Sequence, residues 1–153
     1  MKGTSYTDAI LNFFWEEALK QKARPQREYM NLDMVWWSPW SHITLAFEHE
    51  NSHKRVNKFL NEEVSHLLDV RADRKVGIFY PNTGDEKILV RNIEEHLRYR
   101  ARGRPIPYER YLFILGFPTR KQGKPAIQFK PYYFDETGKP TMGAECIILQ
   151  AQA

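Results

Sequence analysis

Two neighbouring stretches of strand-like sequence constrain the fold most, because each carries acid in an otherwise apolar context. Residues 43–50 alternate between large apolar side chains and a second face that ends in Glu48 and Glu50, since successive side chains of a strand point to opposite faces. The preceding stretch, residues 29–37, carries a third acid, Asp33. Three carboxylates that converge on one sheet repel one another unless a cation or a proton joins them. The pattern therefore predicts a divalent-metal site.

Length, charge and cysteine content narrow the class of protein. A chain of 153 residues is expected to form one compact domain. Its apolar runs are too short to span a membrane, and we expect no signal peptide at its start. Cys146 is the only cysteine, which excludes an intramolecular disulfide and a cysteine-based zinc cluster and favours a reducing, cytoplasmic location. The net charge of +4 and the isoelectric point near 9.2 permit a nucleic-acid partner.

Hydrophobic periodicity predicts the order of the secondary-structure elements. We expect helices over 5–21, 52–70 (with Ser52 as N-cap) and 85–101, a basic linker over 22–27, and strands over 29–37, 43–50, 75–80, 111–117, 126–134 and 145–149. The strands 43–50 and 75–80, joined by a long helix, predict a parallel crossover. The fold class is α/β, with a mixed central sheet flanked by helices. Residues 5–80 form its core, and residues 108–150 extend the sheet or build a dimer surface.

This order of acids and elements resembles the restriction-endonuclease-like superfamily, also called PD-(D/E)xK nucleases. In that family an aspartate opens one core strand, the next strand carries acid-x-lysine, and a helix and a further core strand follow. Asp33, Glu48-His49-Glu50, the helix 52–70 and the strand 75–80 reproduce that order over residues 5–80. The resemblance implies a restriction-endonuclease-like core and a nuclease that hydrolyses phosphodiester bonds in DNA or RNA with Mg²⁺ or Mn²⁺. Many enzymes of this core work as dimers, so the resemblance also admits a homodimer.

The match has two departures from the family pattern. Leu32, not proline, precedes the aspartate, and Glu50 stands where the lysine is expected. The segment 47–52 looks like the Glu-x-Glu-x-Ser segment of acid-x-acid relatives. Asp33 and Glu48 are therefore expected to bind the metal, and Glu50 to be a further ligand or a general base.

The missing lysine has no evident substitute in the sequence. In the family a lysine adds positive charge beside the attacking water. Lys54 and Lys58 are close to the acids in sequence, but a helical wheel places both away from the apolar stripe of the helix 52–70. Some relatives add an acid from the first helix, which makes Glu17 a candidate site residue; a solvated helix flank is the alternative.

A basic tract at the end of the helix 85–101 is the predicted nucleic-acid contact. Its arginines are Arg98, Arg100, Arg102 and Arg104. Arginine forks bind phosphate in a bidentate manner. The alternative is a solvated helix end whose cations favour the C-terminal dipole.

Two other classes of function stay open at this point. The first is a catalytically inactive module with the nuclease fold, which binds nucleic acid or a protein partner without cutting; the absent lysine favours it. The second is a structural or regulatory protein whose acids lie on a solvated sheet face, as alternating strands often do. Metal binding separates the nuclease from both.

Overall fold

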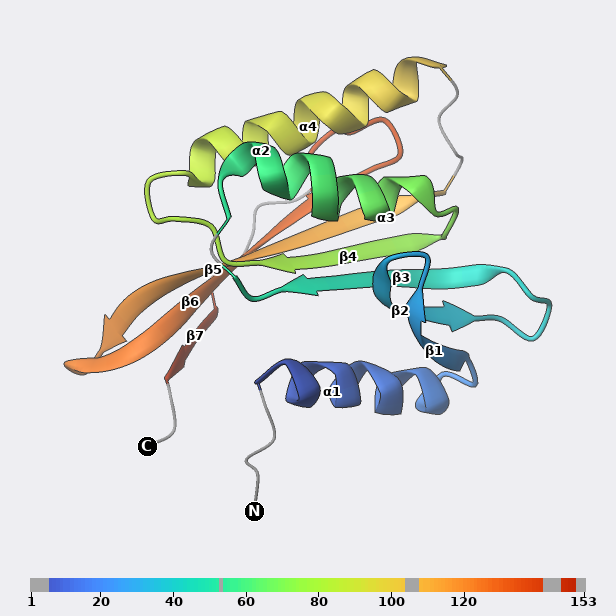
Figure 1. Ribbon diagram of the computed structural model, residues 1–153, viewed down its shortest axis with the longest axis horizontal. Helices are drawn as coiled ribbons and strands as arrows, with labels where there is room; N and C mark the ends of the chain where they lie inside the picture. The colour runs from blue at the N-terminus through green and yellow to red at the C-terminus, as the bar shows by residue number, and fades with distance from the viewer. Residues whose placement is uncertain (1–5, 53, 104–107, 142–146, 151–153) are drawn as a thin grey trace.

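The computed structural model describes residues 6–52, 54–103, 108–141 and 147–150. Its centre is one seven-stranded sheet whose strands lie side by side in sequence order (Figure 1). The elements are α1 (Tyr6–Lys20), β1 (Arg24–Tyr29), β2 (Leu32–Trp37), β3 (Ile43–Glu50), α2 (Val56–Lys58), the π-helical segment η1 (Phe59–Val64), α3 (Ser65–Asp69), β4 (Arg74–Phe79), α4 (Glu86–Gly103), β5 (Arg110–Lys121), β6 (Lys124–Phe134) and β7 (Ile147–Gln150). The three central strands, β3, β4 and β5, are parallel, and the remaining neighbours are antiparallel. The predicted mixed α/β sheet and its parallel crossover are thus confirmed.

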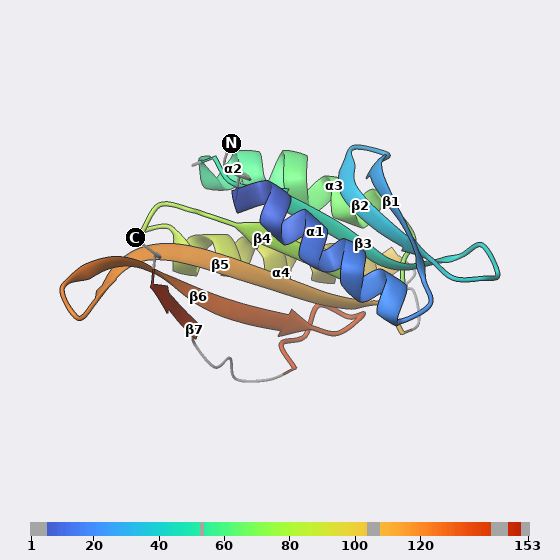
Figure 2. The ribbon, with the colours of Figure 1, turned by 90° about the horizontal axis from the view of Figure 1, so that it is seen from below.

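Helices cover both faces of the sheet. Helix α1 lies across one face, whereas α2, η1, α3 and α4 lie on the other (Figures 1 and 2). Under α1, the Phe14 ring stacks on Phe47 with ring centroids 4.1 Å apart. On the opposite face, Phe59 of η1 packs beside Phe79 of β4, and both are fully buried. Each face of β3 therefore has its own apolar layer, as expected for a central strand.

The linker predicted for residues 22–27 is wrong, because most of it belongs to β1. Strand β1 pairs with β2 in an antiparallel hairpin, and Met30 and Asn31 at its turn both have positive φ, 48° and 64°. Two residues with positive φ are what a tight hairpin turn requires. The sequence of β1, Arg-Pro-Gln-Arg-Glu-Tyr, lacks apolar alternation because the strand is at the sheet edge, where propensity is a weak guide.

The helix predicted over residues 52–70 begins later than expected. Helical structure runs from Val56 to Asp69 through a π-helical segment, with Arg55 at the N-cap. Ser52 is not an N-cap, because its backbone N–H and its hydroxyl both donate to Glu50 Oε1 (2.8 and 2.7 Å). In the wide π turn, the Ser65 hydroxyl donates to the Leu60 carbonyl five residues earlier, at 2.8 Å. Such π segments are frequent at functional sites.

The last strands extend the sheet, and two of them, β5 and β6, continue beyond the end of β4. Strand β4 ends at Phe79, opposite Leu115, but β5 and β6 remain paired to Lys121 and Lys124. These strands are longer than the predicted spans 111–117 and 126–134. Of the strand predicted over 145–149, residues 147–149 lie in β7, while 145 and 146 fall outside the described residues. No helix among the described residues is long and apolar enough to cross a membrane.

Candidate metal site

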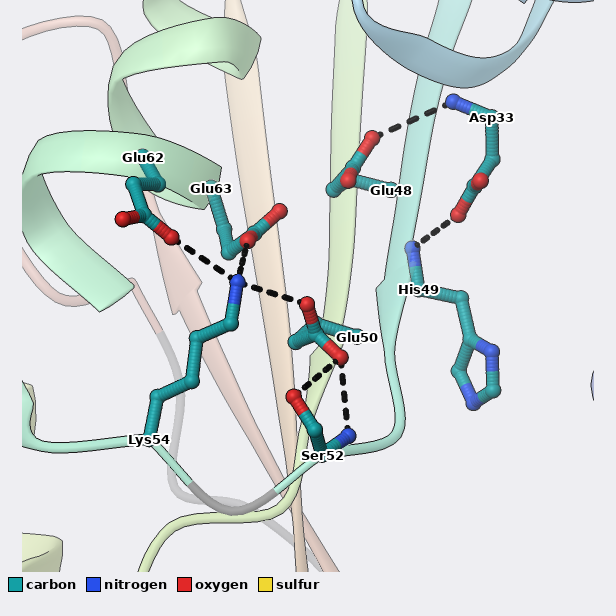
Figure 3. Close-up of polar contacts among 8 residues, drawn as sticks. All are labelled: Asp33, Glu48, His49, Glu50, Ser52, Lys54, Glu62 and Glu63. Carbon is teal, nitrogen blue, oxygen red and sulfur yellow. Dashed lines mark hydrogen bonds and ion pairs between the residues drawn. The ribbon is translucent and has the colours of Figure 1, made fainter. Parts of the chain in front are cut away.

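The first two predicted site residues face each other where β2 and β3 separate. The regular pairing of the two strands ends at Met34 and Phe47. One position further, the Asp33 backbone N–H donates to Glu48 Oε2 (3.1 Å), and the His49 N–H donates to Asp33 Oδ2 (2.7 Å), as Figure 3 shows. The two carboxylates thus take the place of backbone carbonyls in the ladder. Both acids lie on the sheet face that α2, η1 and α3 cover.

The helical layer above the sheet adds two further groups to this site. Glu63 comes from η1 and His66 from α3. One ligand atom each from Glu48, Glu63 and His66 lies within 4.8 Å of the other two. Glu48 and Glu63 are only 7% and 5% exposed. This spacing suits three groups that share one ion, because metal–ligand bonds to oxygen and nitrogen are about 2.0–2.6 Å long.

Glu50 lies beside this trio and is held by a lysine. Lys54 Nζ lies 2.7 Å from Glu50 Oε2 and 2.9 Å from Glu62 Oε2, and it also contacts Glu63 Oε1 (Figure 3). The helical wheel is therefore wrong for Lys54. The residue precedes the first helical turn, so its side chain is free to fold back over the acids. We refer to Asp33, Glu48, Glu50, Glu62 and Glu63 together as the acid cluster.

Burial and mutual repulsion set the charge state of the acid cluster. Burial, a hydrogen bond to Glu63 and the charge of Asp33 raise the pKa of Glu48 to about 10. Burial also raises the pKa of Asp33, against the opposing effect of the His49 N–H. Burial alone would raise the pKa of Glu50, but bonds from Lys54 and Ser52 outweigh it and lower this pKa to about 2. Glu48 therefore carries a proton at neutral pH unless a cation replaces it.

Glu17 does not join the site. It lies on α1, on the opposite side of the sheet from α2 and α3 (Figure 1). Its carboxylate forms an ion pair with Lys20 at 2.6 Å. The alternative interpretation, a solvated helix flank, fits this position, because Lys20 is one helical turn away on the exposed surface.

The predicted arginine tract lies at the other end of the sheet from the acid cluster. Arg98 pairs with Glu94 at 2.6 Å, and Arg100 donates to the Leu68 carbonyl near the end of α3. Arg102 is exposed, and Arg104 lies outside the described residues. In Figure 1, α4 runs away from the end of β3 that carries the acids. Arg100 therefore has a structural contact, and the tract and the acids do not form one continuous site.

Sequence reasoning missed Glu63 and His66, although one signal was present. Glu63 follows Phe59 by four residues and Leu60 by three, so it falls inside the apolar stripe of its helix. An acid in a buried stripe needs a partner, because isolated buried charge is costly. His66 lies one turn further along the same face, at the spacing that brings two helical side chains together.

A second group of polar residues resembles a hydrolytic triad but is a turn. Ser38 Oγ lies 2.7 Å from His42 Nδ1, and His42 Nε2 lies 3.2 Å from Asp73 Oδ2. Ser38 Oγ also accepts the backbone N–H groups of Trp40 and His42. The serine oxygen therefore holds the β2–β3 turn together, and the histidine ties that turn to the start of β4.

Comparisons with known proteins give no family. No protein-family model matches the chain, and no curated protein matches it. Among solved structures, the central domain of yeast acetyl-CoA carboxylase is similar over 84% of this chain and 25% of its own, with 10% identity and a TM-score of 0.43. The YaeQ protein from Xanthomonas axonopodis pv. citri is similar over 95% of this chain and 80% of its own, with 11% identity and a TM-score of 0.33. Function must therefore be argued from the site.

Proposed function

We propose that the protein is a metal-dependent nuclease with a restriction-endonuclease-like core, and that Glu48, Glu63 and His66 hold its metal. The observation that carries this proposal is the approach of these three groups to within 4.8 Å of one another. Asp33 lies next to Glu48 and completes the anionic wall on the side of β2. The proposal keeps Asp33 and Glu48 from the sequence prediction, and places Glu50 as a neighbour of the metal.

The charge balance of the site favours a cation. The acid cluster contains five carboxyl groups, and Lys54 contacts three of them, those of Glu50, Glu62 and Glu63. One lysine cannot neutralise five acids, so the remainder must be protonated or bind another positive ion. The buried Nδ1 atom of His66 also has no hydrogen-bond partner in the described structure. Two buried carboxylates and an imidazole fit a small divalent ion.

The ligand set favours Mn²⁺ over Mg²⁺. Mg²⁺ prefers oxygen ligands alone, whereas an imidazole nitrogen suits transition ions. When bound, such an ion polarises a phosphate oxygen and lowers the pKa of a coordinated water. The residues of the chain then have separate tasks. Glu48 and Glu63 bind the ion, and Lys54 supplies the positive charge that the family lysine would provide beside the reacting phosphate. Glu50 positions Lys54, because its carboxylate accepts from the ammonium group at 2.7 Å.

Metal linkage tests this assignment before any substrate is known. An ion that binds only the folded state, and is present at a concentration of about 100 times its Kd, raises the free energy of unfolding by about 2.7 kcal/mol. In a chain of this size, that shifts the Tm by about 5–11 °C. We expect such a shift with Mn²⁺, and its loss in Glu63→Gln and His66→Gln. Glu62→Gln is the matched control, since Glu62 is the adjacent acid and lies outside the trio.

Cleavage then separates the nuclease from the inactive module. DNA and RNA substrates incubated with Mn²⁺ or Mg²⁺ should be cut by the wild type and left intact by Glu48→Ala. Calcium should support binding without cutting, because it tolerates looser geometry and activates water less. An absent Mn²⁺ shift in the wild type would refute the metal site. No cleavage of either nucleic acid, combined with normal metal-free binding to it, would leave the inactive nuclease-fold module as the function.

A further inference from the structure

The strands β5 and β6 project beyond the sheet at the edge where the acid cluster lies. The strand register shows this directly. Glu50 of β3 pairs with Phe79 of β4, and Phe79 pairs with Leu115 of β5, so the three residues form one row across the sheet. Strands β3, β4 and β5 are parallel, so β5 continues past this row in the direction in which β3 ends. We call residues 116–129, which follow the row, the β5–β6 arm. At about 3.3 Å per residue, the six residues from 116 to 121 have a contour length of about 20 Å past this row. Figures 1 and 2 show the arm as a long curved hairpin.

The arm carries positive charge and no acid. Residues 116–129 contain Arg120, Lys121 and Lys124 and neither aspartate nor glutamate. All three cations are exposed and lie around the turn. The Arg120 guanidinium donates to the Gly123 carbonyl at 3.2 Å, which orders the tip. No carboxylate of the arm competes with an external anion for these groups.

A second pair of exposed cations follows the end of β3. Arg55 and Lys58 are exposed at the start of the helical layer, directly after β3 ends. This pair and the arm therefore lie toward the same edge of the sheet as Glu50. A polyanion at this edge would meet positive charge from both groups. The arginine tract of α4 offers no such arrangement, because it lies at the opposite end.

The chemistry of the tip points to phosphates and not to bases. Residues 119–125 read Thr-Arg-Lys-Gln-Gly-Lys-Pro and contain no aromatic ring on which a base would stack. Lysine and arginine without stacking partners contact the phosphate backbone. Duplex DNA presents about one charge per 1.7 Å of its axis, and its binding is driven by such contacts. We propose that the β5–β6 arm binds the phosphate backbone of a nucleic-acid duplex at the edge of the sheet toward which Glu50 lies; this rests on the proposed nuclease function.

A pair of charge-matched triple variants tests the arm. The arm variant is Arg120→Gln, Lys121→Gln and Lys124→Gln. The control variant is Arg91→Gln, Arg98→Gln and Arg102→Gln, which removes the same charge from exposed positions of α4. Fluorescence anisotropy with a labelled DNA duplex, in EDTA so that nothing is cut, gives the Kd at several salt concentrations. The same strand without its complement, and heparin as competitor, are measured in parallel.

We expect the arm variant to bind the duplex about 10–100-fold more weakly, with a salt slope smaller by about 2–3 units. The control variant should retain most of its affinity. The proposal is overturned if both variants lose affinity equally, if the arm variant loses none, or if the wild type does not bind the duplex. It is also overturned if the single strand binds more tightly than the duplex, or if heparin at equal charge concentration displaces the duplex. The Mn²⁺-dependent Tm shift is measured on the same proteins. Its absence in a wild type whose arm still binds duplex refutes the nuclease and leaves the arm in place.

Discussion

Glu48→Gln should stabilise the metal-free protein, and the size of the gain should depend on pH. The Glu48 carboxyl is only 7% exposed, and its pKa rises from an ordinary 4.5 to about 10 because of burial, the hydrogen bond to Glu63 and the charge of Asp33. The folded state therefore binds a proton that the unfolded state has already released at neutral pH. Glutamine has nearly the same shape and carries no titrating proton.

The sign and magnitude follow from this difference in pKa. A group whose pKa is raised on folding supports stability fully below its unfolded pKa, near 4.5, and loses that support as pH rises toward the folded value. One proton corresponds to about 1.4 kcal/mol for each pH unit. The variant should therefore match the wild type near pH 4.5 and exceed it by about 3 kcal/mol at pH 7, or about 6–12 °C in Tm.

Urea denaturation in EDTA at several pH values between about 5 and 8 measures this directly. Glu62→Gln serves as the control, because this neighbouring acid is largely solvated and paired with Lys54. A constant difference between Glu48→Gln and the wild type across the pH range would refute the reasoning. With Mn²⁺, the wild-type pH dependence should reverse, since the ion displaces the proton and binds more tightly as pH rises.

Three further predictions concern charged side chains, two at the site and one pair elsewhere in the core. Lys54→Met should destabilise the metal-free protein by about 1–3 kcal/mol in urea denaturation, because the carboxylates lose their charged donor; an unchanged free energy of unfolding would contradict this. Glu50→Lys should weaken the Mn²⁺-dependent Tm shift and lower cleavage, since it places a second cation beside Lys54, whereas a gain in activity would show Glu50 to be a passive remnant. Lys75→Met or Glu109→Gln alone should each cost about 3–5 kcal/mol, since the two form an ion pair that is 0% and 1% exposed. The double variant Lys75→Met/Glu109→Gln should cost less than the sum, and strict additivity in urea denaturation would count against a coupled pair.

The sequence was most informative where local patterns decide the structure. Strand β3 matches its predicted bounds, because alternation over eight residues specifies both faces of a central strand. The parallel crossover from β3 to β4 followed from the long helix between them. Asp33 and Glu48 meet because they occupy facing positions of neighbouring strands, which is the relation that the alternation pattern describes.

The sequence was least informative where a side chain reaches across elements. Lys54 precedes its helix, so a helical wheel could not give its direction, and its partners come from two parts of the chain, β3 and η1. Arg100 was counted as a surface cation, but its contact with the Leu68 carbonyl depends on how α4 packs beside α3. Strand β1 was missed because polar edge strands carry little periodic signal, and its turn depends on positive φ at Met30 and Asn31.

The position of β1 at one edge of the sheet also bears on self-association. An exposed edge strand is a template onto which another chain can add through backbone hydrogen bonds. Strand β1 works against such addition in three ways: Pro25 has no N–H group to donate, the exposed Arg24 and Arg27 repel their counterparts in a second copy, and Glu28 has a positive φ of 54° that bends the strand. These are the devices by which natural sheets avoid aggregation at their edges. A continuous sheet of two copies joined at β1 is therefore disfavoured.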